Sequence, residues 1–77
     1  MITIDDELDA RGLNCPLPVM HTKKQLRHMA VGQHLRVITT DPKSVEDMAT
    51  LTNYSGVEMV ESSEANGDFV FIVKKTR

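Results

Sequence analysis

The sequence of 77 residues contains a single cysteine, Cys15. One cysteine cannot form an internal disulfide, a Cys-x-x-Cys redox pair or a multi-cysteine zinc site. No pair of histidine, cysteine or carboxylate residues near it has the spacing of metal ligands, so we expect neither a metal nor a cofactor. Packing alone must then stabilise the chain, and we expect residues 1–77 to form one small domain.

Aromatic residues and long apolar runs are also scarce. Tyr54, Phe69 and Phe71 are the only aromatic residues, too few for the stacking surface of a single-strand nucleic-acid binder. The longest apolar run, residues 69–73, is far shorter than the roughly 20 residues that cross a bilayer. The amino terminus has no charged region followed by an apolar one, as a secretory signal would. We therefore expect a cytoplasmic protein with no membrane partner.

Acidic residues are absent from residues 10–40, although the net charge of the whole chain is −2. Five cations lie in this segment: Arg11, Lys23, Lys24, Arg27 and Arg36. A charged run is usually a solvated face, but an acid-free stretch can also bind an acidic partner. We expect Lys23, Lys24 and Arg27 to form a docking surface for such a partner.

The hydrophobic pattern predicts the element order βαβαββ. Residues 7–10 and 35–40 are expected to be strands, as are residues 57–62 and 69–74, which Asn66-Gly67 would join in a tight hairpin. Two helices cannot cover both faces of a four-stranded sheet in so short a chain. We therefore expect an α+β fold, a two-layer βαβαββ sandwich with a mixed four-stranded sheet and both helices on one face.

Periodicity also predicts which faces of the two helices point inward. The first helix would start at Pro16 and stop before Gly32, and the second would follow residues 41–44 and close at Gly56. Ser44 and Asp47 have the spacing of a weak capping box. The inward residues of the first helix would be Val19, Lys23, Leu26 and Ala30, and those of the second would be Val45, Met48, Ala49 and Thr52. Both Met20 and Met29 are expected to fill the core.

The prolines around Cys15 predict its environment. Proline is favoured at the first helical position, so Pro16 there makes Cys15 the N-cap residue and places Pro18 at the third position. Because Pro18 has no N–H, the Leu17 N–H is the donor left to hold the sulfur. The helix dipole and the nearby Arg11 would both lower the pKa of the thiol. We therefore expect Cys15 to be a reactive thiol rather than a small buried side chain.

The residues that Cys15 lacks are equally informative. His21 is turned to another side of the helix, and His28 lies about 20 Å along it. His34 could approach only through the tertiary fold, and all three histidines are expected at the surface. Without an identifiable base and orienting group near Cys15, we do not expect a thiol hydrolase. The pattern favours a carrier rather than an enzyme that turns over alone: Cys15 would accept a sulfane sulfur as a persulfide and pass it to another nucleophile.

The segment Leu8-Asp9-Ala10-Arg11-Gly12-Leu13-Asn14-Cys15-Pro16-Leu17-Pro18 matches the pattern L-D-x-x-G-x-x-C-P-x-P at every fixed position. In this it resembles the TusA-like (SirA/YedF-type) family of sulfur carrier proteins. The resemblance implies a fold like the C-terminal domain of translation initiation factor three and a persulfide on Cys15. It also implies that Pro16 and Pro18 shape the start of the helix.

The resemblance further implies two kinds of partner. A cysteine desulfurase or a rhodanese-type donor would load Cys15, and a downstream acceptor would take the sulfur for tRNA thiolation, for molybdenum-cofactor enzymes or for sulfur oxidation. We expect a monomer that does not bind nucleic acid directly. Two alternatives stay open: an RNA- or tRNA-binding module that uses the five cations, and a redox-sensing domain that uses a sulfenic acid at Cys15.

Overall fold

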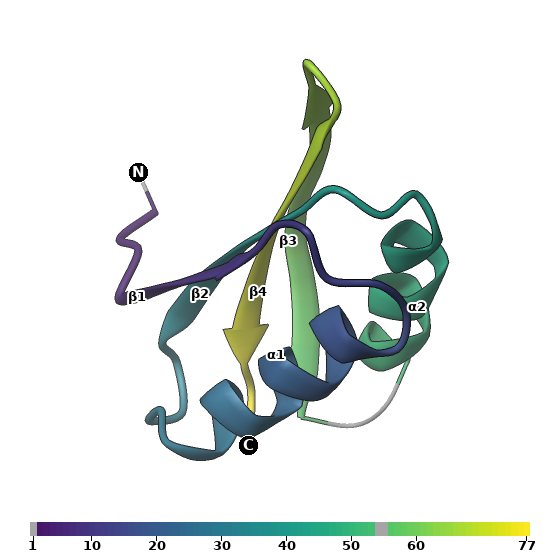
Figure 1. The fold of residues 1–77 in the computed structure, drawn as a ribbon. Helices are drawn as coiled ribbons and strands as arrows, with labels where there is room; N and C mark the ends of the chain where they lie inside the picture. Colours follow the sequence, from purple (N-terminus) through teal and green to yellow (C-terminus); the bar gives the residue numbers. More distant parts are fainter. Residues whose placement is uncertain (1, 54–55) are drawn as a thin grey trace.

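The structure is a computed structural model that describes residues 2–53 and 56–77. Its elements are β1 (Asp6–Ala10), α1 (Leu17–Arg27), β2 (His34–Thr39), α2 (Lys43–Thr52), β3 (Val57–Ala65) and β4 (Asp68–Lys75). The sheet order is β1-β2-β4-β3, with β1 parallel to β2 and the other two pairs antiparallel. Both helices lie on one face of this sheet (Figure 1). The expected α+β sandwich is confirmed.

The core lies between the sheet and the helices, and strand alternation places it there. In β2, every second residue is buried: Leu35, Val37 and Thr39. Leu35 pairs with Val73 of β4 and Val37 with Phe71, so the two central strands present one continuous inward row. Met48 of α2 and Leu26 of α1 pack against this row from the helix layer. Burial of these apolar side chains supplies most of the stabilisation available to so small a domain.

Helix α1 is rotated relative to the expectation. It buries three residues at four-residue spacing: Pro18, Thr22 and Leu26. Of the predicted inward set only Leu26 is buried; Val19 is half-buried, and both Lys23 and Ala30 are exposed. The polar Thr22 can be buried because its hydroxyl donates to the carbonyl of Pro18 at 2.8 Å. Met29 packs in the core as expected, but Met20 is 56% exposed.

Helix α2 also differs from its predicted form. It buries Ser44, Met48 and Leu51, whereas Val45, Ala49 and Thr52 are not in the core. The capping box is wrong, because the Ser44 hydroxyl donates to the carbonyl of Asp41 at 2.6 Å and lies 2.5 Å from the Thr39 hydroxyl. The helix ends at Thr52 rather than at Gly56.

Neither helix that the structure describes has the length and the apolar character of a membrane span.

The hairpin between β3 and β4 forms at the predicted turn. Asn66 and Gly67 both have positive φ, of 53° and 85°, as the two central residues of a type I′ turn require. The strands run further toward this turn than predicted, and the hairpin tip extends beyond the helix layer (Figure 1). A register shift between Met59 and Glu61 interrupts the pairing of β3 with β4 in the half of the hairpin that lies away from the turn.

Candidate functional site

Cys15 is exposed and lies in the loop between β1 and α1. Because β1 and β2 are parallel, this loop and the loop that follows β2 leave the same end of the sheet. Two hydrogen bonds join them. The N–H of Gly12 donates to Oγ1 of Thr40 at 2.9 Å, and the N–H of Cys15 donates to Oδ2 of Asp41 at 2.8 Å. The backbone of Cys15 is therefore fixed against the start of α2.

The expectation that Cys15 caps α1 is wrong by one residue. The helix begins at Leu17, and the residue at its N-cap position is Pro16. The N–H of Leu17 donates to the carbonyl of Asn14 at 2.8 Å, so it is not the donor that holds the sulfur. Pro16 is exposed, whereas Pro18 is buried beneath the first turn. The peptide bond between Cys15 and Pro16 is cis.

Arg11 also takes a different role from the one expected. Its guanidinium donates to both carboxylate oxygens of Asp9, each at 2.9 Å, and lies 4.0 Å from the carboxylate of Asp68. The hydrogen bonds from Arg11 lower the pKa of Asp9 to about 2. Arg11 is not among the groups that influence the pKa of Cys15; its charge is paired instead with Asp9 of β1 and lies near Asp68 of β4. The expectation that it supports a thiolate is wrong.

The groups that act on Cys15 are mainly acidic. The pKa of the thiol is raised above its ordinary value, first by a hydrogen-bonding interaction with the carboxylate of Asp47. Partial removal from water and the charges of Asp47 and Asp41 act in the same direction, and only Lys43 opposes them. An anionic neighbour disfavours the thiolate, so the site favours the protonated thiol over the thiolate. The sequence led us to expect a lowered pKa, and this expectation is wrong.

Asp47 is the residue of the site that the sequence interpretation missed. It projects from α2 toward α1, where it lines a cavity of about 140 Å³ with Val19 and Lys23. Its Oδ2 is buried and has no hydrogen-bond partner among the described residues. Asp47 lies 32 residues beyond Cys15 in the sequence, so no local spacing connects the two. The available signal was topological, since loops that follow parallel neighbouring strands meet at one end of a sheet.

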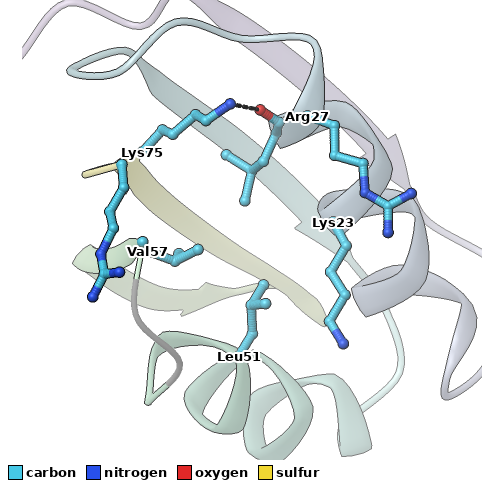
Figure 2. A pocket seen from close by; sticks show the side chains of 8 residues that line it. Lys23, Arg27, Leu51, Val57 and Lys75 are labelled. Carbon is cyan, nitrogen blue, oxygen red and sulfur yellow. Dashed lines mark hydrogen bonds between the residues drawn. The ribbon is translucent and has the colours of Figure 1, made fainter.

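The expected docking residues lie along the exposed side of α1. Arg27 lies about 15 Å along α1 from Leu17, the first helical residue after the Cys15 loop. Lys23 and Arg27 also border a cavity of about 350 Å³ between the helices, with Leu51 and Val57 in its floor (Figure 2). Lys75 and Arg77 complete its rim, and no acidic residue lines it among those described. This end of the molecule is therefore strongly cationic.

The histidines take no part in the Cys15 site. His21 and His28 are exposed, as expected, and His34 is half-buried in β2. None of the three is among the groups that influence the thiol. Within residues 2–53 and 56–77, no three His, Cys, Asp or Glu side chains are grouped so that they could hold a metal ion. The chemistry of the site therefore depends on one thiol and its acidic neighbours.

Comparison with known proteins places this geometry in a family. The chain is 50% identical over 76 residues to the sulfur carrier protein TusA of Allochromatium vinosum, covering 99% of this chain and 100% of that protein. It is 41% identical to the sulfur carrier protein TusA of Pseudomonas putida, covering 95% and 91% of the two chains.

The fold and the family description agree with these relatives. The structure superposes on the crystal structure of a SirA-like protein from Desulfitobacterium hafniense with a TM-score of 0.80, at 23% identity, covering 94% of this chain and 99% of that one. At this identity the likeness concerns the fold alone. Residues 6–75 match the family described as sulfurtransferase TusA. The match covers nearly the whole chain, which therefore belongs to the TusA family.

Proposed function

We propose that this protein is a sulfur carrier in which Cys15 bears the sulfur as a persulfide. The observation that carries the proposal is the placement of the lone cysteine: exposed, held by its backbone at 2.8 Å from Asp41, and without a second cysteine in the sequence. A persulfide there is open to other proteins and cannot be lost to an internal disulfide. The relatives named as sulfur carriers support the same function.

The transfer is redox-neutral. The sulfur of Cys15 bonds to the terminal sulfur of a donor persulfide while the S–S bond of the donor breaks, and the donor leaves as a thiol. The reverse exchange with an acceptor thiol unloads the carrier. A cysteine desulfurase or a rhodanese-type protein is the proposed donor, and a further sulfur-transfer protein is the proposed acceptor. The carrier is thus a co-substrate of sulfurtransferases.

The cations of α1 are the proposed docking surface for these partners. Lys23, Lys24 and Arg27 are exposed and line one surface hollow together with Met20, which is 56% exposed. Leu17, at the start of the same helix, is 42% exposed. Exposed apolar side chains beside cations are typical of surfaces that bind other proteins. An acidic partner segment would meet the cations while its reactive sulfur lies over Cys15. We further propose that residues 1–77 act as a single, monomeric domain in the cytoplasm, where an exposed thiol stays reduced.

Mass spectrometry of the intact protein tests the carrier function. The protein is incubated with a cysteine desulfurase and cysteine, and the reaction is stopped without a reductant. We expect the mass of one added sulfur atom on the wild type and none on Cys15→Ser. An equal adduct on both proteins, or no adduct with either a desulfurase or a rhodanese donor, would overturn the proposal. None of the comparisons favours the RNA-binding or the redox-sensing alternative.

Charge reversal tests the docking surface separately. The double variant Lys23→Glu with Arg27→Glu should load several-fold more slowly from the desulfurase, and the difference should shrink as salt screens the charges. Its reaction with a small persulfide should be unchanged, because no protein partner is involved. Lys74→Glu, on β4, is the matched control. If the double variant and this control load from the desulfurase at equal rates, the cations of α1 are not part of the docking surface.

A further inference from the structure

We propose that Asp47 is the proton acceptor for Cys15: its carboxylate holds the thiol proton in the empty carrier and takes that proton when the sulfur attacks a donor persulfide. The inference rests on the proposed carrier function and assigns to that site a second residue. The sequence interpretation had left Cys15 without any base. The structure supplies one from the neighbouring helix.

The geometry of the two helices carries the inference. Asp47 lines a small cavity between the two helices together with Val19, which lies in the first turn of α1, just after the Cys15 loop. The backbone of Cys15 is bonded to Asp41, less than two turns before Asp47 on the chain that enters α2. The loop that carries Cys15 is therefore held between the start of α2 and the first turn of α1, the two elements that adjoin Asp47. The interaction between the thiol and this carboxylate is the first influence on the titration of Cys15.

The burial of the Asp47 carboxylate is a second observation in favour of the inference. Oδ2 of Asp47 is shielded from water and has no hydrogen-bond partner among the described residues. A buried acceptor without a partner is costly to folding and calls for an explanation. An oxygen that must be ready to receive a proton provides one. The neighbouring Glu46 is exposed on the same helix and has no such constraint.

The proposed step balances without an added oxidant or reductant. The S–H bond of Cys15 breaks and its proton passes to the Asp47 carboxylate, while the Cys15 sulfur bonds to the terminal sulfur of the donor. The S–S bond of the donor breaks, and its electron pair leaves with the donor sulfur. That thiolate then takes the proton from Asp47. Cys15 ends as a persulfide, the donor as a thiol, and Asp47 as the carboxylate with which the step began.

Other charged groups around the pair define the necessary controls. Asp41 and Lys43, both from the start of α2, act on Cys15 with opposite signs. Lys23 faces the Asp47 cavity from α1. Arg11 is paired with Asp9 and Asp68 and does not act on the thiol. A variant at Asp47 must therefore be compared with another acid of α2 that is exposed and does not act on the thiol, which is Glu46.

The test compares two reactions of Cys15 across pH in the 77-residue protein. Alkylation by iodoacetamide requires the free thiolate, whereas sulfur uptake from glutathione persulfide can use a proton acceptor. Both rates are followed by intact mass for the wild type, Asp47→Asn, Asp47→Glu and Glu46→Gln. The protonation of each reagent is the same for all four proteins, so it cancels when the variants are compared. Urea unfolding of each variant checks that its fold is retained.

For each protein, the rate of sulfur uptake is divided by the rate of alkylation at each pH. As pH falls, this ratio should become larger in the wild type and in Glu46→Gln than it is in Asp47→Asn. In Asp47→Asn, alkylation should begin at lower pH, because a negative neighbour is lost, yet sulfur uptake near pH 6.5 should fall at least about tenfold below the wild type. Asp47→Glu should restore part of the uptake. An Asp47→Asn ratio that follows the wild type at every pH would overturn the role of Asp47. Failure of the wild type itself to take up sulfur would instead overturn the carrier function.

Discussion

The backbone N–H of Cys15 donates to Oδ2 of Asp41 at 2.8 Å, across 26 residues of sequence. The other carboxylate oxygen of Asp41 accepts the N–H of Lys43 at 3.0 Å. One side chain therefore both fixes the start of α2 and holds the loop that carries the reactive sulfur. The same two donors lower the pKa of Asp41, which keeps the acceptor ionised in ordinary buffers.

Replacing Asp41 should loosen the Cys15 loop before it disturbs the sheet. In Asp41→Ala, both N–H groups lose their acceptor, so the amide of Cys15 should exchange with solvent roughly tenfold faster. Hydrogen exchange followed by NMR measures this rate residue by residue. Asp41→Asn keeps one side-chain oxygen and should lie between the wild type and the alanine variant. Unchanged exchange at Cys15 in Asp41→Ala would contradict the contact.

The fold could be predicted from the sequence because strand alternation and turn residues act locally. The row of Leu35, Val37 and Thr39 has period two, and Asn66-Gly67 has the positive φ that a tight hairpin needs. The rotation of the helices could not be predicted in the same way. Thr22 and Ser44 are buried because tertiary neighbours and backbone carbonyls satisfy their hydroxyls, and hydrophobic periodicity assigns such residues to the surface.

The reactive residue was identifiable from the sequence, but its electrostatics were not. Cys15 stands out through the pattern of prolines that follows it. Its pKa depends on Asp41 and Asp47, which reach it only after β2 has paired with β1. Arg11 is the nearest cation in the sequence, yet its guanidinium is paired with Asp9 and does not act on the thiol. Proximity along the chain therefore gave the wrong sign for the shift.

The ion pair of Arg11 and Asp9 predicts an acid titration. Asp9 should titrate near pH 2 in the wild type and at a higher pH in Arg11→Met, still below its ordinary value of 3.8 because the backbone N–H of residue 11 continues to donate to Asp9 at 3.1 Å. Because the folded pKa is depressed, the pair stabilises the fold above about pH 3.8, and this contribution is lost as pH falls through about 2. Carboxyl carbon shifts in NMR report the titration. Arg36→Met, which removes a separate contact with Glu7, should leave Asp9 unchanged.

The same variant, Arg11→Met, also tests whether the ion pair of Arg11 and Asp9 influences the Cys15 thiol. Since Arg11 does not act on Cys15, the pH profile of thiol alkylation should match that of the wild type. An alkylation profile shifted to higher pH would instead mean that the guanidinium stabilises the thiolate.

The hydrogen bonds of Lys75 at the C-terminal end of α1 should contribute to the free energy of unfolding. Its Nζ donates to the carbonyls of Leu26 and Met29 at 2.9 and 2.8 Å, and Figure 2 shows the first of these bonds. These carbonyls lie where α1 ends, and a cation there also meets the negative end of the helix dipole. Lys75→Met should cost about 1 to 3 kcal/mol in the free energy of unfolding, measured with urea. Lys74→Met, whose side chain makes neither bond, should cost far less.

Lys43 provides the last test of the electrostatics at Cys15. It is the one group that lowers the pKa of the thiol, against Asp47 and Asp41. In Lys43→Met the pKa should rise further, so the thiolate fraction at pH 8 falls and alkylation by iodoacetamide slows, by roughly two- to fivefold at low ionic strength. Lys43→Arg should retain the wild-type rate, and 1 M salt should narrow the difference, because it shortens the Debye length to about 3 Å. Lys24→Met, on α1, is the control. If Lys43→Met and Lys24→Met react alike at low salt, the positive charge at the start of α2 does not reach the sulfur.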